Sequence, residues 1–578
     1  MIRRFPAPGR PGTSVARPIF SVVLLVIAGP ALADQSEARR DPRSLHREVP
    51  DDPPAARPVL PDEAFPPSAA PVIRGTFQSV QVNVNSFGNN IPGDAANEPS
   101  IAVDPTNPDR MVIGWRQFDS VTSNFRQAGW AYSHDAGQTW TFPGVIEPGV
   151  FRSDPVLDSD HNGNFFYFSL TTVSQQYLVH SFKSTNGGVS WQPRVNAGGG
   201  DKEWMAIDKT NSIGRGHIYH VWSPFYSCCP GFFTRSTNGG ASFMTPITIP
   251  EDLFWGTIAI GPEGQVYVSG IEPFQSDFVV TRSTNARNAA VTPSFDFVST
   301  VDLGGEMAYG DGPNPGGLLG QVWVATDVSN APSRGNVYLL CSADPPDADP
   351  LDVMFARSTD GGLNWSNPVR VNDDPSSATA WQWFGTISVA PSGRIDVIFN
   401  DTRYDPTVTF SELFYAYSTD AGNTWSDNIA LTPPWNHFVG YPMQNKIGDY
   451  YHMVSDQVGA RIAYAATFNN EQDVYFLHLK IDCNNNGFHD GDDIASGRSP
   501  DVNGNGIPDE CEAGPCGDFD GDGDVDLTDF TQFQLCFGGS NNPPAPTCPP
   551  GVDADCDNDG DVDLADFIIF QQNFTGSR

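Results

Sequence analysis

Short β-rich runs separated by turn residues recur from residue 76 to residue 481. In each unit an apolar run comes first, a second β-rich run follows a turn, and a third leads into a polar turn. Seven apolar openers stand roughly 50 to 65 residues apart, which is the length of four short strands with their connections. The pattern predicts an all-β array of seven units. The openers are residues 98–103, 154–157, 203–207, 255–259, 321–324, 385–389 and 449–453.

The polar turn that follows the third run has the repeated pattern Ser-x-Asp-x-Gly-x-x-Trp. Aspartate or asparagine holds a tight turn through bonds to backbone amides, and glycine permits a positive φ. The aromatic residue packs the turn onto the strands behind it. Copies with aspartate stand at 133–140, 358–365 and 418–425, copies with asparagine at 184–191 and 236–243, and a sixth begins at Ser283 and decays. The middle of the chain is therefore a repeat array.

This turn resembles the Asp-box (BNR) repeat of sialidases and related β-propellers, where it is a structural clip between the third and fourth strands of a blade. The resemblance implies an all-β, Asp-box β-propeller over residues 76–481. Seven openers favour seven blades, with the six blades usual in sialidases as the alternative. The last unit has three strands and no box, so we expect residues 76–82 to supply its fourth strand and close the ring.

Antiparallel strands place the starts of first strands and the ends of second strands on one face, called here the strand-start face. The boxes lie on the opposite face, the box face. Polar and aromatic residues collect on the strand-start face and suit a funnel that binds sugars. The alternative for each of them is a structural role, in which it ties neighbouring blades together. The predicted ligand-binding residues are Glu98, Glu203, Trp255, Trp383, Asp401 and Asp449, joined by Arg116, Asp154, Trp222, Arg403 and Tyr404.

Hydrolysis is the alternative to binding. In sialidases three arginines clamp the substrate carboxylate, a tyrosine with a glutamate partner is the nucleophile, and an aspartate is the acid/base. A neutral tyrosine avoids repelling an anionic substrate. The predicted catalytic residues here are Arg116, Arg403, Tyr404 and Asp154. The family's early Arg-Ile-Pro motif is absent, since residues 151–155 read Phe-Arg-Ser-Asp-Pro. The sequence therefore favours a protein that binds glycans or a protein partner, with an exo-sialidase-like glycoside hydrolase as the alternative.

The composition changes after residue 481, where 21 acidic residues face two basic ones. Four segments match the twelve-residue EF-hand-type loop, with ligands at positions 1, 3, 5, 7, 9 and 12 and glycine at position 6. The predicted Ca²⁺ ligands are Asp482, Asn484, Asn486, Phe488, Asp490 and Asp493; Asp501, Asn503, Asn505, Ile507, Asp509 and Glu512; Asp518, Asp520, Asp522, Asp524, Asp526 and Asp529; and Asp555, Asp557, Asp559, Asp561, Asp563 and Asp566.

The first two loops, in residues 482–513, resemble the thrombospondin type 3-like calcium repeats of secreted bacterial proteins. The last two, in residues 514–578, are each followed by a helical apolar pattern and resemble a dockerin, a small α-helical calcium-binding module. That resemblance implies docking to a cohesin-like or cell-surface protein. The Ser-Thr pair that often follows the ninth loop position in dockerins is replaced by Leu527-Thr528 and Leu564-Ala565, which leaves the partner open.

The N-terminal residues and the charge indicate the compartment. Residues 1–33 have the arginines, the apolar run and the small-residue cleavage site of a signal peptide, and residues 34–75 read as a disordered proline-rich linker. No later segment reaches the roughly 20 apolar residues of a membrane helix. A net charge of −37 argues against nucleic acid as a partner. We expect a secreted protein, either free or attached to the cell surface.

Cysteine usage agrees with export, because six of the nine cysteines lie in the small tail. Six cysteines allow 15 pairings. We expect Cys483–Cys511 to join the first two calcium loops, Cys228 and Cys229 to form a vicinal bridge, and Cys341 to be a buried thiol.

Overall fold

The computed structural model describes residues 69–272, 277–346 and 348–481, and parts of the tail. The predicted signal peptide and most of the predicted linker lie outside the described residues. In the tail the described parts are residues 490, 493–494, 497–500, 508, 517, 519, 525–540, 542–549, 552, 554–556, 560–572 and 574.

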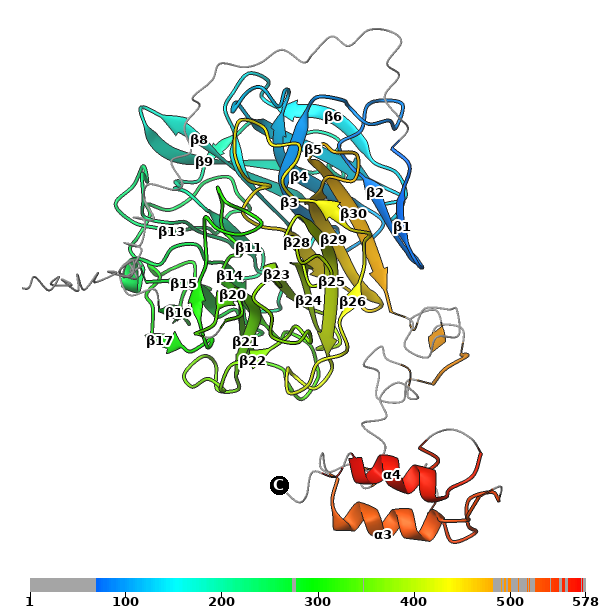
Figure 1. The fold of residues 1–578 in the computed structure, drawn as a ribbon. Helices are drawn as coiled ribbons and strands as arrows, with labels where there is room; N and C mark the ends of the chain where they lie inside the picture. Colours follow the sequence, from blue (N-terminus) through cyan, green and yellow to red (C-terminus); the bar gives the residue numbers. More distant parts are fainter. Residues whose placement is uncertain are drawn as a thin grey trace, which may run out of the picture. The chain divides into compact units, whose positions relative to one another are not determined.

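Seven antiparallel sheets follow one another along residues 72–480 and surround a common centre (Figure 1). The predicted seven-blade propeller is confirmed. Blade 1 contains β3 (Ala95–Val103), β4 (Met111–Phe118), β5 (Gln127–Ser133) and β6 (Thr141–Ile146); blade 2 contains β7 (Ser153–Ser159), β8 (Phe165–Val173), β9 (Gln176–Ser184) and β10 (Val195–Asn196). Blade 3 contains β11 (Trp204–Ile207), β12 (Ile218–Val221) and β13 (Phe233–Ser236); blade 4 contains β14 (Ile258–Ile260), β15 (Val266–Ile271), β16 (Phe278–Ser283) and β17 (Phe297–Val301), preceded by the 3-10 turn η1 (Pro250–Asp252).

The remaining three sheets carry extra strands at their edges. Blade 5 contains β18 (Glu306–Met307), β19 (Trp323–Thr326), β20 (Val337–Asp344), β21 (Asp352–Ser358) and β22 (Val369–Arg370). Blade 6 contains β23 (Gln382–Val389), β24 (Ile395–Asp401), β25 (Phe410–Ser418), β26 (Ile429–Ala430) and β27 (Trp435–Asn436). Blade 7 contains β28 (His452–Ser455), β29 (Gly459–Ala466) and β30 (Asp473–Lys480), with β2 (Phe77–Gln81) and β1 (Val72–Arg74) on its outer side.

The ring closes as predicted, because β2 pairs with β30 and joins the first described strands to the last blade. Ser79 lies opposite Leu477 in that pairing. The propeller begins earlier than the predicted boundary at residue 76, since β1 folds back on β2 through Gly75, whose φ is +57°. Glycine adopts this left-handed conformation at low cost, so the apolar end of the predicted linker becomes a hairpin strand.

In each Asp box the side chains of the turn accept hydrogen bonds from its own backbone amides. The aromatic residue of the box packs against the preceding blade. In the copy at 418–425, Asp420 Oδ1 accepts bonds from Ser418 Oγ (2.7 Å) and Thr424 N (3.0 Å), and Ser418 Oγ accepts from Gly422 N (2.9 Å). The box ring of Trp425 packs edge-on against Phe355 of blade 5 at 5.2 Å. These contacts confirm the structural interpretation of the box.

The decayed sixth copy keeps the same bonds across a longer turn. Asn285 Oδ1 accepts from Ser294 N at 2.8 Å, nine residues away, where the other boxes span four. Phe295 then takes the place of the box tryptophan and packs against Phe233 of blade 3 at 5.4 Å.

We expect Asp420→Ala to lower the free energy of unfolding by about 1–3 kcal/mol, because it leaves turn amides without an acceptor. Asp420→Asn is the matched control, since asparagine holds the same turn at Asn186 and Asn238. Chemical unfolding of the two variants should separate them. Equal stability of the alanine and asparagine variants would show that the box carboxylate does not hold the turn.

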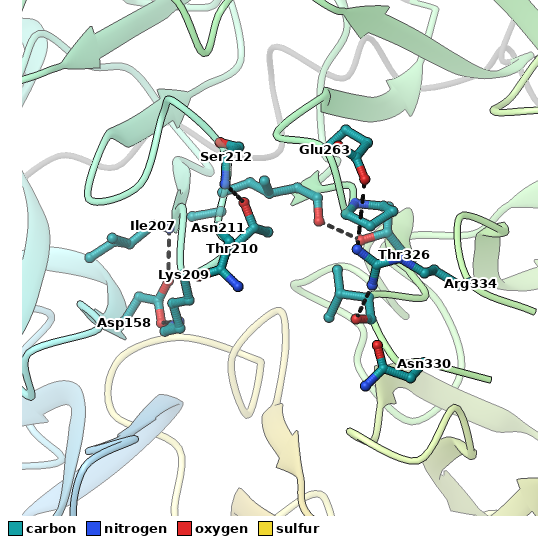
Figure 2. Close-up of a pocket in the computed structure, with 14 residues that line it drawn as sticks. Asp158, Ile207, Lys209, Thr210, Asn211, Ser212, Glu263, Thr326, Asn330 and Arg334 are labelled. Atoms are coloured by element: carbon teal, nitrogen blue, oxygen red, sulfur yellow. Dashed lines mark hydrogen bonds and ion pairs between the residues drawn. The ribbon is translucent and has the colours of Figure 1, made fainter.

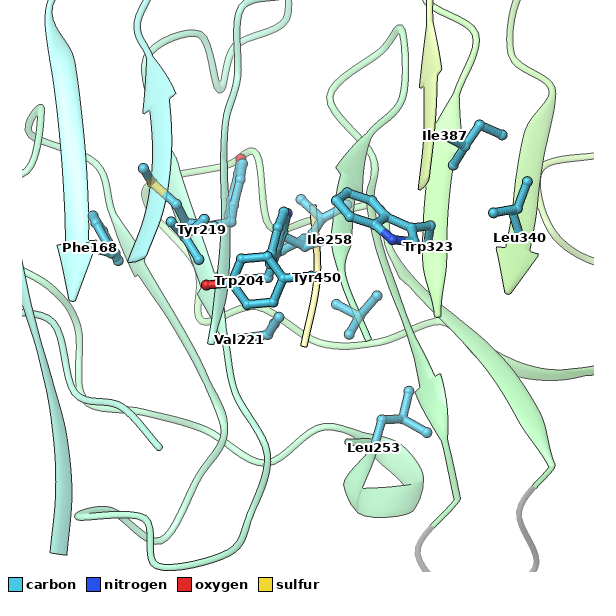
Figure 3. Packing of buried hydrophobic residues seen from close by; sticks show 14 of the residues in the cluster. Phe168, Trp204, Tyr219, Val221, Leu253, Ile258, Trp323, Leu340, Ile387 and Tyr450 are labelled. Carbon is cyan, nitrogen blue, oxygen red and sulfur yellow. The ribbon is translucent and has the colours of Figure 1, made fainter. Parts of the chain in front are cut away.

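The centre of the ring is filled by aromatic side chains from blades 3, 5 and 7. Trp204 contacts Trp323 at 4.8 Å and Tyr450 at 5.3 Å between ring centroids, and His452 packs against both tryptophans. Figure 3 shows Trp204, Tyr450 and Trp323 gathered between the inner strands. This packing separates the strand-start face from the box face with a dry core.

In the tail, α3 (Leu527–Cys536) and α4 (Leu564–Gln572) follow the last two predicted calcium loops. They confirm the small helical domain predicted there. Their apolar residues enclose a cluster around Phe533 and Phe570, and a disulfide joins Cys536 to Cys548.

The vicinal bridge Cys228–Cys229 and the buried thiol Cys341 are confirmed. The predicted pair Cys483–Cys511 lies outside the described residues. Among the described residues, no helix has both the length and the apolar character needed to cross a bilayer.

Candidate functional site

Four of the predicted charged residues of the strand-start face meet Lys202 in one buried ion network between blades. Lys202 Nζ lies 2.7 Å from Asp449 Oδ2 and 3.2 Å from Asp154 Oδ2, and Arg116 Nε lies 3.1 Å from Glu98 Oε2. These five side chains have no exposed surface. We call them, with Lys446, the axial ion network.

Left-handed backbone conformations direct the side chains of this network inward. Glu98, Asp154 and Lys202 have φ of 50°, 45° and 50°, and the pairing of β3 and β7 with their neighbours shifts register at the first two. Such bulges re-aim a side chain at a modest cost in strain. The left-handed residues occur at the same place in blades 1, 2 and 3. The carboxylates of Glu98 and Asp154 therefore meet the ammonium of Lys202.

Sequence reasoning missed both lysines of the network. Lys446 Nζ lies 2.6 Å from Asp449 Oδ2 and 3.7 Å from Glu98 Oε1. The sequence holds no signal for either lysine beyond the position of Lys202 directly before the opener that starts at Glu203. Each carboxylate of the network thus lies close to at least one cation, which is the condition for burying ions at tolerable cost.

Within the network, burial and neighbouring charges shift the pKa values of the side chains in opposite directions. Burial lowers the pKa of Lys202, but Asp154, Asp449 and Glu98 outweigh it and hold that pKa well above its usual value. For Glu98 burial dominates over Arg116 and Lys202 and raises the pKa to about 8. Burial and the charge of Asp154 raise the pKa of Glu203 well above its usual value. Neither carboxyl oxygen of Glu203 has a hydrogen-bond partner among the described residues.

The six predicted ligand-binding residues are all buried. Trp255 is 1% exposed, Trp383 and Glu203 0%, and Asp401 2%. Trp383 donates from Nε1 to Ser411 Oγ at 3.1 Å inside blade 6. A ligand therefore reaches these residues only if the segments above them move. Their contact with a ligand stays a prediction, as it does for Glu98 and Asp449.

Two loop segments cover the strand starts. Asn314, between β18 and β19, donates to Gly448 O at 2.8 Å and accepts from Ile447 N at 3.0 Å. Leu318 N donates to Asp449 Oδ1 at 2.9 Å. These bonds tie the loop of blade 5 to the segment that enters blade 7, and the strand-start face is closed at that point.

The predicted catalytic residues fall into two groups. Arg116 and Asp154 belong to the axial ion network. Arg403 pairs with Asp401 at 2.8 Å and lies over the ring of Phe414, while Tyr404 is 69% exposed. The contacts described for Arg116 and Arg403 share no residue. The catalytic roles of the four residues stay predictions.

A cavity of about 600 Å³ opens instead on the box face, where first strands end. Ten residues join β11 to β12 and ten join β19 to β20, but only five join β14 to β15 between them. The short connection of blade 4 leaves a hollow between the two long ones (Figure 2). Its lining is Asp158, Ala206, Ile207, Lys209, Thr210, Asn211, Ser212, Ile260, Pro262, Glu263, Thr326, Val328, Asn330 and Arg334.

In the tail, carboxylates of the last loop converge as a hard-cation site requires. Asp561, Asp563 and Asp566 each offer an oxygen, and these oxygens lie within 4.8 Å of one another. Asp555 Oδ2 accepts from Gly560 N at 2.9 Å, which folds the loop between positions 1 and 6. An all-oxygen donor set on a tight loop fits Ca²⁺.

The third loop shows the same outer contacts. Asp529 accepts from the amides of Phe519 (2.7 Å) and Asp526 (2.8 Å), as Asp566 does from Cys556 (2.6 Å) and Asp563 (2.7 Å). In the first loop Asp490 and Asp493 are described and buried. The other ligands predicted in the first two loops lie outside the described residues, as do Asp518, Asp520, Asp522, Asp524, Asp557 and Asp559.

No protein-family model matches this sequence, and no curated protein matches it. Among solved structures, the chain is similar to a protein of unknown function from Dyadobacter fermentans, with 15% identity and a TM-score of 0.40 over 71% of this chain and 99% of that one. It is also similar to an α-L-arabinofuranosidase from Fusarium graminearum, with 13% identity and a TM-score of 0.38 over 70% of this chain and 98% of that one. A sialidase from Streptococcus pneumoniae has 10% identity and a TM-score of 0.37 over 59% of this chain and 69% of that one. Such scores are too low to carry a functional argument.

Proposed function

We propose that this chain is a secreted, calcium-binding propeller that binds glycans without cleaving them and is attached to a partner through its C-terminal module. The observation that argues against sialidase-like cleavage at the strand-start face is the axial ion network. Glu98, Asp154 and Asp449 of the strand-start face are fully buried and paired with Arg116, Lys202 and Lys446. A general acid or nucleophile must reach the bond that it breaks, and these side chains do not reach solvent. The glycan ligand is suggested by the Asp-box repeat.

The calcium component rests on the last loop. Asp561, Asp563 and Asp566, with Asp555 opposite, would hold the ion. When bound, Ca²⁺ neutralises these carboxylates and fixes the start of α4. The equivalent contacts of Asp529 at the start of α3 support a second ion in the third loop.

The docking component rests on the apolar surface of α3 and α4. Leu527 is 70% exposed and Leu564 63%, and a hollow of about 370 Å³ between the helices is lined by Phe530, Phe533, Gln534, Phe537, Leu564 and Phe567. Exposed apolar surface of this kind is typical of a site for a protein partner. A cohesin-like or cell-surface protein is the partner that the dockerin resemblance suggests. The bridges Cys228–Cys229 and Cys536–Cys548 support an oxidising compartment outside the cell.

The test combines binding and turnover on the full chain in calcium. We expect the protein to bind members of an oligosaccharide array and to leave a fluorogenic sialoside intact. Turnover of the sialoside that falls to background in Arg403→Ala would establish the hydrolase alternative. Turnover that is equal in both proteins would establish a hydrolase whose site lies elsewhere.

A further inference from the structure

We propose that the glycan enters the propeller from the box face, in the 600 Å³ cavity between blades 3 and 5, and that it is a neutral saccharide. This inference rests on the proposed glycan binding and assigns it a site. It places the ligand on the face opposite to the strand-start funnel that the sequence predicts.

The cavity is built by a duplicated loop. Residues 208–217 and 327–336 share the pattern Asp-x-Thr/Ser-Asn-x-x-x-Arg-Gly-x. In both, the first aspartate accepts from the amide two residues on, at 2.8 Å to Thr210 and 2.8 Å to Ser329. In both loops a glycine amide also donates to the carbonyl of that aspartate. Gly216 N lies 2.8 Å from Asp208 O, and Gly335 N lies 2.9 Å from Asp327 O. The two walls are therefore held before any ligand arrives, which lowers the entropy lost on binding.

Two kinds of surface meet in the cavity. Its apolar part consists of aliphatic side chains, and its polar part has amides and hydroxyl oxygens whose own hydrogens are donated within the protein. The side chain of Asn330 is exposed and makes no hydrogen bond within the described part of the chain. A sugar presents aliphatic C–H faces and hydroxyl edges, so it complements both surfaces. The aliphatic residues are Ala206, Ile207, Ile260, Pro262 and Val328.

The charges of the lining cancel in pairs. Lys209 is paired with Asp158 on one wall, and Arg334 NH2 lies 3.7 Å from Glu263 Oε1 on the other, as Figure 2 shows for the second pair. Arg334 also donates to the carbonyls of Val328 and Ser329 at 2.7 Å. Both cations of the lining are therefore paired with carboxylates, which favours a neutral sugar over an acidic one. The volume lies within the roughly 300–1,000 Å³ of ligand pockets.

A bulky side chain at the rim should block the cavity without touching the core. We expect Asn330→Trp to weaken binding of the best neutral oligosaccharide from the array at least about tenfold. Gln457→Trp is the matched control, since Gln457 is an exposed amide in the corresponding β28–β29 turn of blade 7, on the same face but outside the cavity. It should bind as the wild type does. Glu263→Trp, from the short loop of blade 4, is a second blocking variant if the first does not fold.

Four results would overturn the inference. Unchanged binding by both blocking variants would place the ligand elsewhere and leave glycan binding intact. A preference of the wild type for sialylated members of the array would contradict the neutral ligand. Absence of binding to any member of the array would remove the proposed function as well, and binding of a peptide instead would assign the cavity to another class of ligand.

Discussion

Lys202→Met should lower the free energy of unfolding of the propeller by about 3–5 kcal/mol, the range found when one partner of a buried ion pair is removed. The reason is that the carboxylate of Asp154 would stay buried without its ammonium, and Asp449 would keep only that of Lys446. All 13 tryptophans lie in the propeller, so tryptophan fluorescence during urea unfolding follows this part of the chain alone.

Lys209→Met is the matched control for this prediction. Lys209 is paired with Asp158 on the surface, where its side chain is 40% exposed. Solvent screens that pair, so its loss should cost less than about 1 kcal/mol. If the two methionine variants unfold at the same urea concentration, the axial ion network is not what ties the blades together.

Removal of calcium should unfold the C-terminal module while the propeller stays intact. Without a cation, Asp561, Asp563 and Asp566 repel one another, and two short helices bury too little apolar surface to compensate. Phe533 and Phe570 are each 2% exposed, so chymotrypsin reaches them only in the unfolded module. At a calcium concentration of 100 times Kd, binding slows this cleavage by about a hundredfold.

The measurement is limited chymotrypsin digestion of the full chain with calcium, with EDTA and with magnesium, followed by mass spectrometry. In calcium, chymotrypsin should cleave the Asp566→Asn variant as fast as it cleaves the wild type in EDTA. Asp360→Asn, which alters an Asp box instead, should stay protected. Digestion should be repeated under reducing conditions because the Cys536–Cys548 bridge holds the module compact. Protection of the reduced module in EDTA would contradict the calcium requirement.

The blades, the ring closure and the boxes could be predicted because each depends on a local pattern that repeats. A box such as 418–425 contains both the acceptor Asp420 and the amides that it binds. The strand that closes the ring could be found because blade 7 lacks a partner for β30.

The burial of the strand-start face could not be predicted in the same way. It depends on Asn314 meeting Gly448 from a segment 134 residues away. Glu98, Arg116, Asp154 and Asp449 of that face do meet in the ion network, but the cover that closes over them has no periodic signal. Lys202 and Lys446 were missed for a similar reason, since a lone lysine beside a strand start predicts nothing until the facing carboxylates are known.

The box-face cavity did leave a trace in the sequence. The shared pattern of residues 208–217 and 327–336 marks two equal long loops, and Gly261 to Gln265 marks the short one between them. A comparison of loop lengths between blades would have indicated the hollow. The first strands of all blades end on the same face, so a short loop between two long ones leaves a space there. The choice of ligand needed the structure, since the pairing of Arg334 with Glu263 joins two different blades.

Binding without cleavage is tested most directly by titrating the full chain with the best oligosaccharide from the array and recovering that oligosaccharide from the same sample. The account predicts a saturating titration and an unchanged ligand mass after prolonged incubation at working temperature. Recovery of a shortened oligosaccharide, in amounts that grow with time and with protein concentration, would contradict it.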